Sequence, residues 1–575
     1  MTEHYSLGKY RATVENAIAE ASRKSWVRRL WAKDATLWKT DSGHAAIIAN
    51  AMGWLNVAEE LAVKTRRVKS FAEEVRAKGF TSTCLLGMGG SSLCPEVCAV
   101  TYGKKTGFLN LLVLDTTDPA SILNVERKLD LARTLFIVAS KSGGTIESAS
   151  LQKYFYEKLA KVKGGMAGEN FVAITDPGTS LENLANDLRF RDTFLNMKDI
   201  GGRYSALSYF GLVPMALIGL DVDEILKRAA NMMQRCQVTE DPTANPGLRL
   251  GVTLGTLALS GLDKLTLHFS PEISTFGWWV EQLVAESTGK EGLGILPVEG
   301  ETLGTPSLYG NDRVFIQVHL AGGNNAASEA HLRTLEEAGH PVLRWELQDA
   351  MDLGSEFFLW EFATAVAGAV LAINPFDQPN VQESKDNTQR IIRRYSETRR
   401  FDEGMPAAHE GPLSLYCSPE MTQTLLTGGA GLPPSSLPTA LASFFRMAQP
   451  RDYAALLAYI DRSPANGAAL DAIRVCLREK LGVAATIGFG PRFLHSTGQL
   501  HKGGANNGIF LQITAQDSAD IEIPGASYSF GTLKRAQSIG DMEALIMRGR
   551  RAVRLHIEGD LADGLLRLAH IVESF

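Results

Sequence analysis

Residues 140–148, Ser-Lys-Ser-Gly-Gly-Thr-Ile-Glu-Ser, place four hydroxyls, two glycines and a lysine within nine positions. The stretch follows an apolar run rich in β-branched residues (134–139) and leads into a helical pattern that extends to Lys161. It is therefore predicted to form a strand-to-helix turn, where free backbone N–H groups and the helix dipole favour a bound phosphate. Taken alone, the same pattern is more often an ordinary capped helix after a loop.

A second turn rich in glycine and serine, 87–92 (Gly-Met-Gly-Gly-Ser-Ser), also follows a predicted strand and opens a predicted helix. A dinucleotide fingerprint would need glycine at position 92, where serine stands, although Asp115 resembles the ribose-binding acid of such folds. The carboxyl ends of neighbouring parallel strands meet at one edge of a sheet. Two serine-rich loops at that edge therefore favour a phosphate-sized ligand over a dinucleotide.

Two further motifs supply a cation and a carboxylate. Arg203 lies in the glycine-flanked turn 201–205 (Gly-Gly-Arg-Tyr-Ser), where a guanidinium can donate hydrogen bonds to an oxyanion. Glu286 lies at the end of a mainly apolar helix, just before a Gly-Lys turn, where partial desolvation tunes a carboxylate to act as a base. Taken alone, the first motif is as often a surface arginine, and most glutamates like the second are on helix surfaces.

The elements that must position these motifs alternate between short apolar strands and helices. One alternation runs from a strand at 83–87 to a helix at 180–188, and a second from a helix at 245–262 to a helix at 381–395. Such alternation predicts parallel sheets that are covered by helices on both faces. The two rounds share no repeat of fixed period, so the likeness is one of architecture only.

The rest of the chain is predicted from shorter patterns. Residues before about 80 are predicted to be helical, and 428–436 is predicted to be a linker. The region beyond it is predicted to contain helices at 437–448, 453–460, 470–480 and 561–572, and strands at 485–488, 508–514 and 552–556. The predicted domains are an N-terminal helical segment (1–40), a first α/β domain (41–235), a second α/β domain (236–400) and a C-terminal α/β extension (401–575).

Composition restricts the class of protein. The chain has 575 residues, 45% of them hydrophobic and 21% charged, and its net charge of −6 argues against nucleic acid as the main partner. The N-terminus lacks the apolar region of a signal peptide, and the apolar stretches 206–220 and 357–376 are interpreted as buried helices, so no membrane partner is expected. The six cysteines form no CxxC pair, and no metal set is visible. We expect a cytoplasmic protein with reduced thiols.

Taken in chain order, the motifs resemble those of the glucose-6-phosphate isomerase (phosphoglucose isomerase) family. The stretch 140–148 resembles the sugar-phosphate-binding loop of SIS domains. The full set comprises 87–92, 140–148, 201–205, Glu-Ser-Thr-Gly-Lys at 286–290, and Asn-Pro-Phe-Asp-Gln at 374–378 followed by Lys385. The resemblance covers about residues 40–400, and five motifs in the same order are more specific than any one of them.

The resemblance implies a fold and an activity. The fold would be two tandem SIS-type domains, each a doubly wound parallel sheet in an αβα sandwich, with the C-terminal extension added. The activity would be reversible aldose–ketose isomerisation of glucose 6-phosphate and fructose 6-phosphate through a cis-enediol, in glycolysis and gluconeogenesis. It would need no cofactor and no metal, and the protein would be a homodimer.

The resemblance also implies roles for individual residues. Glu286 would carry a proton between C2 and C1, Arg203 would stabilise the enediolate, and Lys385 would aid ring opening. Substrate binding is implied for Gly90, Ser91, Ser140, Lys141, Ser142, Thr145, Ser148, Gln282 and Gln378.

The chain departs from the family at the histidine that serves ring opening. The corresponding stretch, 309–315, contains no histidine, so Asp312, Arg313 or a histidine from elsewhere would have to replace it. Residues after 400 resemble the C-terminal extension of the isomerase half of fused transaldolase/glucose-6-phosphate isomerase proteins. Within them, the polar stretch 490–508 offers His495 and His501 as replacements, or is a structural loop at a sheet edge.

Two other functions stay open at this point. One is another SIS-group isomerase that acts on an amino sugar or also on mannose 6-phosphate. The other is a non-catalytic sugar-phosphate sensor, although the joint presence of Glu286, Arg203 and Lys385 speaks against it.

Overall fold

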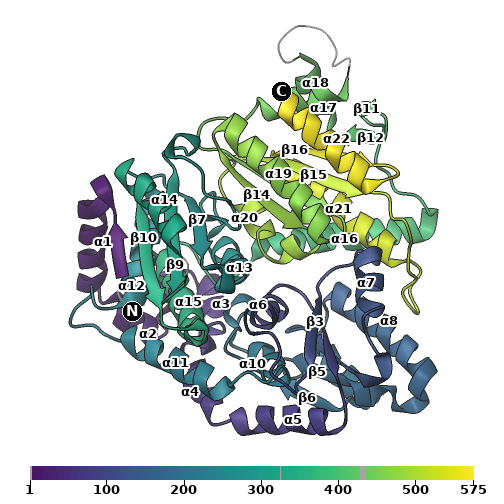
Figure 1. The fold of residues 1–575 in the computed structure, drawn as a ribbon, viewed down its shortest axis with the longest axis horizontal. Helices are drawn as coiled ribbons and strands as arrows, with labels where there is room; N and C mark the ends of the chain where they lie inside the picture. Colours follow the sequence, from purple (N-terminus) through teal and green to yellow (C-terminus); the bar gives the residue numbers. More distant parts are fainter. Residues whose placement is uncertain (1–2, 324, 428–435) are drawn as a thin grey trace.

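The computed structural model describes residues 3–323, 325–427 and 436–575, which form three mainly parallel sheets. Each sheet is the centre of one module, and the first, second and third modules are named here in the chain order of their sheets. In Figure 1 the second module lies on the left, the first at the lower right, and the third at the upper right. This arrangement confirms the predicted α/β class with several parallel-sheet domains.

The first module contains five parallel strands in the order β3-β2-β4-β5-β6. Their bounds are Asn110–Leu114, Ser82–Gly87, Thr134–Ala139, Phe171–Thr175 and Asp192–Leu195. The helices of this module are α6 (Leu93–Tyr102), α7 (Pro119–Glu126), α8 (Ile146–Lys163), α9 (Ser180–Asp187), α10 (Tyr209–Leu217) and α11 (Val222–Arg235). All six residues of β4 are buried, because helices cover both faces of the sheet.

The second module contains five strands in the order β1-β10-β9-β7-β8. Their bounds are Glu3–Ser6, Val342–Leu347, Arg313–Leu320, Lys264–Phe269 and Leu296–Val298. The helices are α12 (Pro246–Leu259), α13 (Phe276–Thr288), α14 (Ala326–Glu337) and α15 (Leu353–Val370). The next helix, α16 (Pro379–Thr398), packs on α21 (Phe530–Met547) of the third module. Helix α12 packs closely on α15, since a β-carbon at Gly251 would lie 2.3 Å from the Ala363 carbonyl oxygen.

The N-terminal segment is not wholly helical, and that prediction is wrong at residues 3–6. These residues form β1, which pairs antiparallel with β10 at the edge of the second sheet. A four-residue strand is too short to show a period, so only its pairing partner defines it. The helices that follow are α1 (Arg11–Arg23), α2 (Trp26–Trp31), α3 (Ser42–Ala49), α4 (Val57–Ala62) and α5 (Thr65–Ala77).

The third module contains a six-stranded sheet in the order β11-β12-β16-β15-β13-β14. Their bounds are Ala408–Glu410, Leu413–Tyr416, Arg551–Ile557, Gly508–Ala515, Tyr453–Tyr459 and Ala484–Phe489. The last four strands in this order are parallel, and the first two are antiparallel additions. The helices are α17 (Pro419–Thr427), α18 (Leu437–Phe445), α19 (Pro464–Leu481), α20 (Gly498–Gly503), α21 (Phe530–Met547) and α22 (Leu561–Ser574).

The predicted helix at 453–460 is wrong, because these residues form the strand β13. All seven residues of β13 are buried, and the strand lies between β14 and β15. A strand covered on both faces shows no alternation of polar and apolar residues, and its alanines and leucines favour a helix locally. The predicted linker at 428–436 lies almost entirely outside the described residues, which omit 428–435.

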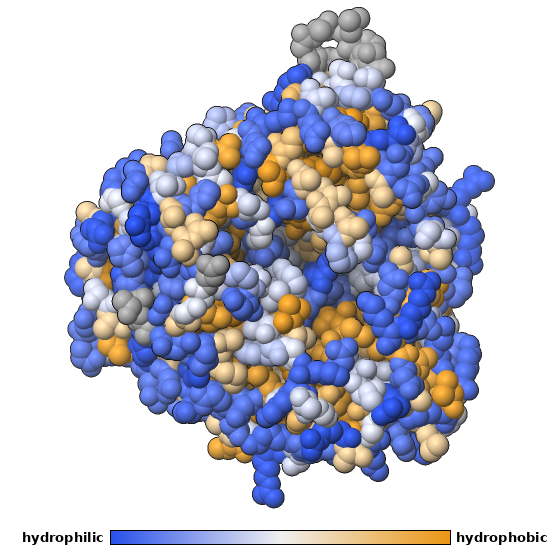
Figure 2. Space-filling view, viewed as in Figure 1, coloured by the Kyte–Doolittle hydropathy of each residue, from blue (hydrophilic) through white to orange (hydrophobic). Residues whose placement is uncertain are grey.

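The third module lies against both other modules. Figure 2 shows the surface hollowed near the centre of this face, where the modules meet. A cleft of about 500 Å³ separates the carboxyl end of β3 and α7 from the third module, and its lining includes Asp115, Arg127, Arg462 and Arg492. No helix in the described part of the chain is long and apolar enough to cross a membrane.

Candidate active site

The turn at 140–145 joins β4 to α8, as predicted. Ser140 Oγ and Thr145 Oγ1 lie 2.9 Å apart, and Thr145 occupies the N-cap position of α8 without a side-chain capping hydrogen bond. Ser148, in the first turn of the helix, is buried, and its hydroxyl has no hydrogen-bond partner among the described residues. An uncapped helix start beside three hydroxyls is well suited to bind an anion.

Two other residues of this turn are placed differently. The Lys141 ammonium pairs with the Asp176 carboxylate and donates to the Lys198 carbonyl at 2.8 Å. Ser142 is exposed at the tip of the turn. In this conformation Lys141 is therefore held by the first module.

The turn 87–92 packs directly on the turn that carries Arg203. A β-carbon at Gly90 would lie 1.9 Å from the Gly202 carbonyl oxygen, so glycine alone permits this contact. Ser205 Oγ donates to the Gly90 carbonyl at 3.4 Å. The packing places Ser91, which is buried, beside the arginine turn.

The Arg203 guanidinium and the Glu286 carboxylate face each other, with Nη1 and Oε1 3.6 Å apart. Both side chains are buried. Arg203 Nε donates to Ser287 Oγ at 2.7 Å, and Nη2 donates to the Pro375 carbonyl at 2.6 Å. These bonds fix the guanidinium while leaving its charge close to the carboxylate.

The substrate-facing glutamines predicted from the family resemblance flank this pair. Gln378 Oε1 accepts from Arg203 Nη1 at 2.8 Å. Gln282 Nε2 donates to Glu286 Oε2 at 3.2 Å and to the His495 carbonyl at 2.7 Å. The second of these bonds ties the base on α13 to the third module.

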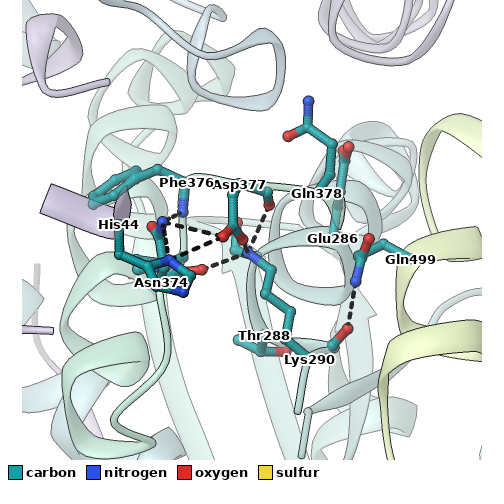
Figure 3. Close-up of polar contacts among 12 residues, drawn as sticks. His44, Glu286, Thr288, Lys290, Asn374, Phe376, Asp377, Gln378 and Gln499 are labelled. Atoms are coloured by element: carbon teal, nitrogen blue, oxygen red, sulfur yellow. Dashed lines mark hydrogen bonds and ion pairs between the residues drawn. The ribbon is translucent and has the colours of Figure 1, made fainter. Parts of the chain in front are cut away.

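Lys290 has a structural role that the sequence pattern around Glu286 does not predict. Figure 3 shows its side chain reaching the turn at 374–378, where Nζ donates to the Asp377 carbonyl at 2.6 Å and lies 2.8 Å from Asp377 Oδ1. His44 Nδ1 lies 3.3 Å from the other carboxylate oxygen of Asp377. Burial, and then the charge of Arg203, lower the pKa of Lys290 to about 7.

His495 meets the first module at Glu147. His495 ends a short 3-10 helix, and its Nε2 lies 3.1 Å from Glu147 Oε1. Burial alone would raise the pKa of Glu147, but the charge of His495, hydrogen bonds and the charge of Lys385 together hold it below its usual value. Glu147 lies within the predicted phosphate loop but carries no signal of its own, because only its contact with a distant histidine distinguishes it.

His501 lies elsewhere, in the interior of the third module. Its Nδ1 is 3.0 Å from the Tyr453 hydroxyl, and its ring stacks on the Tyr453 ring at 5.8 Å between centroids. Burial, and then the charges of Lys502 and Arg550, lower the pKa of His501 to about 3. The two candidate histidines are thus separated, and the structure brings only His495 to the site.

Of the other residues considered for ring opening, one lies near the site and two are held elsewhere. Lys385 lies on α16 with an exposed side chain, close enough to Glu147 to affect its pKa. Asp312 and Arg313 are held in buried ion pairs, with Lys264 at 3.4 Å and Glu301 at 3.1 Å. These ion pairs lie within the second module, so they explain the burial of both side chains without a role in the site.

Asp115 also has a structural partner. Its Oδ2 lies 2.7 Å from Arg492 Nη1 and accepts from Ser92 Oγ at 3.1 Å. The carboxylate is therefore engaged in joining the first and third modules, which removes the acid on which the dinucleotide alternative depended. Within the described ranges no group of three or more metal-binding side chains is present, and all six cysteines are free thiols.

Comparison with known proteins finds similarity to glucose-6-phosphate isomerases. A family model described as Phosphoglucose isomerase matches residues 44–300. A glucose-6-phosphate isomerase from Leptospira interrogans is 27% identical over 380 residues, which cover 58% of this chain and 85% of the relative. One from Trichormus variabilis is 30% identical over 295 residues, which cover 48% of this chain and 52% of the relative.

Two solved structures share the fold. A hypothetical protein from Thermus thermophilus has a TM-score of 0.58 and 24% identity, over 68% of this chain and 99% of that chain. A glucose-6-phosphate isomerase from Chlamydia trachomatis has a TM-score of 0.57 and 20% identity, over 69% of this chain and 89% of that chain. The family match includes the 140–148 turn, Arg203 and Glu286. The chain is therefore similar to glucose-6-phosphate isomerases, and its residues 44–300 match the phosphoglucose isomerase family model.

Proposed function

We propose that this protein interconverts glucose 6-phosphate and fructose 6-phosphate through a cis-enediol, as a step of glycolysis and gluconeogenesis. One observation carries the proposal: the buried Glu286 carboxylate lies 3.6 Å from a guanidinium that is fixed by further hydrogen bonds. Isomerisation next to a carbonyl needs one base and a fixed positive charge where the oxyanion develops. The names of the curated relatives support the same activity.

Each step can be assigned to side chains of this site. Glu286 removes the proton from C2 of the open-chain aldose and returns it to C1, while a hydroxyl proton moves from O2 to O1. Arg203 stabilises the negative charge that develops on the enediolate oxygen. Gln378 and Gln282 hold the guanidinium and the carboxylate in place and contact the sugar. The reaction consumes no cofactor.

The phosphate end of the substrate is assigned to the start of α8 and the facing turn. Ser140, Thr145 and Ser148 supply hydroxyls beside the helix N-terminus, and Ser91 and Ser142 extend the set. Gly90 contributes by allowing the two turns to pack. Lys141 would join the phosphate only by leaving Asp176, so we assign it a supporting part.

Ring opening is assigned to His495. As an imidazolium it gives a proton to the ring oxygen while the C1–O5 bond breaks, and the C1 hydroxyl loses its proton to solvent as the carbonyl forms. Glu147 stabilises that imidazolium, and Lys385 aids the same step from α16. The burial of His501 against Tyr453 favours a structural part for that histidine.

The proposal extends to partners and compartment. The substrate is a small sugar phosphate, and the free state of all six cysteines is consistent with a cytoplasmic enzyme. The homodimer implied by the family resemblance stays a prediction, which light scattering on the purified protein would test.

A coupled assay of fructose 6-phosphate conversion tests the activity. We expect wild-type turnover and a loss of roughly 10²- to 10⁴-fold in Glu286→Gln, the usual range for a general base. Glu361→Gln is the matched control, because burial holds the pKa of Glu361 well above its usual value and glutamine resembles the protonated acid. Sugar-phosphate binding without turnover in the wild type would contradict the proposal and favour a sensor.

A further inference from the structure

A chain of hydrogen bonds that starts in the first module and passes through Gln537 of the third module ends on Glu147. Thr117 Oγ1 donates to Gln537 Oε1 at 2.7 Å, and Gln537 Nε2 donates to Glu147 Oε1 at 2.7 Å. The same Glu147 oxygen faces His495 Nε2 at 3.1 Å. Thr117, Gln537 and Glu147 are all buried, with exposed fractions of 0%, 2% and 3%.

We infer that Gln537 is a positioning residue for ring opening, which holds the Glu147 carboxylate in the orientation that faces His495. The inference rests on the proposed function, and it assigns the third module a specific task in it. Gln537 itself acts through Glu147 and His495 and is not assigned a contact with the substrate.

The chemistry of the amide fits this task. An amide N–H holds a carboxylate by a hydrogen bond but carries no charge, so the negative charge of Glu147 stays available to the imidazolium. A lysine or arginine at this position would compete with His495 for that charge. The amide orientation is also determined, because reversing it would turn its carbonyl oxygen toward the carboxylate.

The helix that carries Gln537 is anchored on the same face on either side of it. Lys534, Gln537 and Asp541 stand three and four positions apart on α21, which places them on one helix face. Lys534 Nζ donates to Asp118 of the first module at 2.7 Å, and Asp541 Oδ1 lies 2.6 Å from Lys502 Nζ on α20. All three side chains are buried, and each has a partner outside α21. This polar face therefore fixes the position of Gln537 relative to Glu147.

The anchoring explains how a distant helix can control an angle at the site. Asp118 caps α7 by accepting from the Ser121 N–H at 2.9 Å, and Thr117 directly precedes it. Both ends of the Gln537 amide therefore meet groups of the first module that are themselves held. Without the Gln537 donor, the buried Glu147 carboxylate would rotate or become protonated, and either change would weaken its interaction with His495.

The experiment uses the full-length protein and glucose 6-phosphate deuterated at C2. Where proton transfer from C2 limits turnover, deuterium slows the reaction; where ring opening limits it, the isotope effect falls toward unity. We expect Gln537→Leu to lower ring-form turnover roughly tenfold to a hundredfold, as misplacement of a positioned group does, and to suppress the isotope effect. The acid limb of its pH profile should move to higher pH, because Glu147 loses a hydrogen bond to its charged form.

A matched control separates positioning from loss of structure. Gln512 is also buried in the third module, and its Nε2 donates to the Ser538 carbonyl of the same helix α21 at 3.0 Å. Gln512→Leu should change neither the isotope effect nor the acid limb. Thr117→Val removes only the hydroxyl that donates to Gln537. It should change the isotope effect and the acid limb in the same direction as Gln537→Leu, but by a smaller factor. If Gln537→Leu does not fold, Thr117→Val decides the question.

The outcomes are distinguishable. A wild-type protein that does not interconvert the two sugar phosphates would overturn the proposed function and this inference with it. An active wild type in which Gln537→Leu folds but keeps the full isotope effect and an unmoved acid limb would overturn the positioning part alone. Equal changes in Gln537→Leu and Gln512→Leu would do the same, because they would indicate a general disturbance of α21.

Discussion

The two halves of the proposed site, one assigned to proton transfer and the other to ring opening, are built in different ways. The proton-transfer half joins Arg203, Glu286 and the turn at 374–378, each of which lies in a short motif with glycine or proline beside it. The ring-opening half joins Glu147 to His495 and Gln537, which are 348 and 390 positions away along the chain and come from a different module. The first half joins the first and second modules, and backbone carbonyls of the turn at 374–378 help to hold Arg203 there. The second half joins the first and third modules through side chains.

This difference indicates where each half can fail. Turns with many backbone hydrogen bonds keep their shape when one side chain changes, so a substitution in the first half should remove chemistry without moving its neighbours. The second half depends on how the third module lies against the first, through ion pairs such as Arg492 with Asp115. A change at that boundary should therefore affect ring opening before it affects proton transfer.

The sharpest way to break the comparison is His495→Ala. We expect ring-form turnover to fall roughly 10²- to 10³-fold, within the range of a lost general acid, because the variant lacks the group to which we assign protonation of the ring oxygen. The C2 deuterium isotope effect should fall toward unity, since proton transfer by Glu286 would no longer limit the rate. A full isotope effect on the slowed reaction would place His495 in the proton-transfer half instead.

The proton-transfer half was open to prediction from the sequence, and the reason is local. Arg203 and Glu286 stand in short glycine-containing motifs at the ends of elements, which marks each as a candidate from the sequence, although their pairing joins two different modules. Glu147 lies in the first turn of α8, within the predicted phosphate loop, and Gln537 lies inside α21. No pattern of composition or spacing pairs a glutamine with a glutamate 390 positions away. The same limit explains β13, whose burial on both faces is a tertiary property that its alanine- and leucine-rich sequence does not show.

Lys290→Met tests whether the first half is held as one unit. Its ammonium binds the turn whose Gln378 contacts Arg203, so losing it should loosen that turn. We expect roughly a tenfold loss of kcat/KM with the isotope effect retained, because proton transfer stays limiting. A suppressed isotope effect would show that the two halves are coupled and would contradict the division.

The lowered pKa of Lys290 also predicts that the free energy of unfolding depends on pH. Its pKa is lowered to about 7 in the folded protein, so the unfolded chain binds more protons between pH 7 and the usual lysine pKa near 10.5. The free energy of unfolding should therefore rise with pH in that window, by up to about 1.4 kcal/mol per pH unit, relative to Lys290→Met. Urea unfolding of the wild type and of Lys290→Met at pH 7 and pH 9 measures both free energies of unfolding. If the wild-type value does not rise relative to the variant value between these pH values, the ammonium keeps its proton.

His501→Phe is expected to have the smallest effect on turnover and gives the closest control for His495, which lies six positions earlier. The aromatic volume is kept, but the Tyr453 hydroxyl loses its partner at 3.0 Å, which should lower the free energy of unfolding by about 1–3 kcal/mol. The pKa of His501 is lowered to about 3 in the folded state, so at acid pH the unfolded chain gains a proton that the folded chain does not. Wild-type stability should fall between pH 6 and pH 4, and the stability gap to His501→Phe should narrow there.

Ring-form turnover and its isotope effect at neutral pH should be unchanged in His501→Phe. His501 is enclosed in the third module by Tyr453 and Phe510, and its stabilising role requires the neutral ring, whereas His495 Nε2 lies 3.1 Å from the Glu147 carboxylate. One histidine is therefore suited to packing and the other to giving up a proton. A His501→Phe protein that is well folded yet loses the isotope effect would assign ring opening to the buried histidine, and the side chains at the module boundary would then be structural.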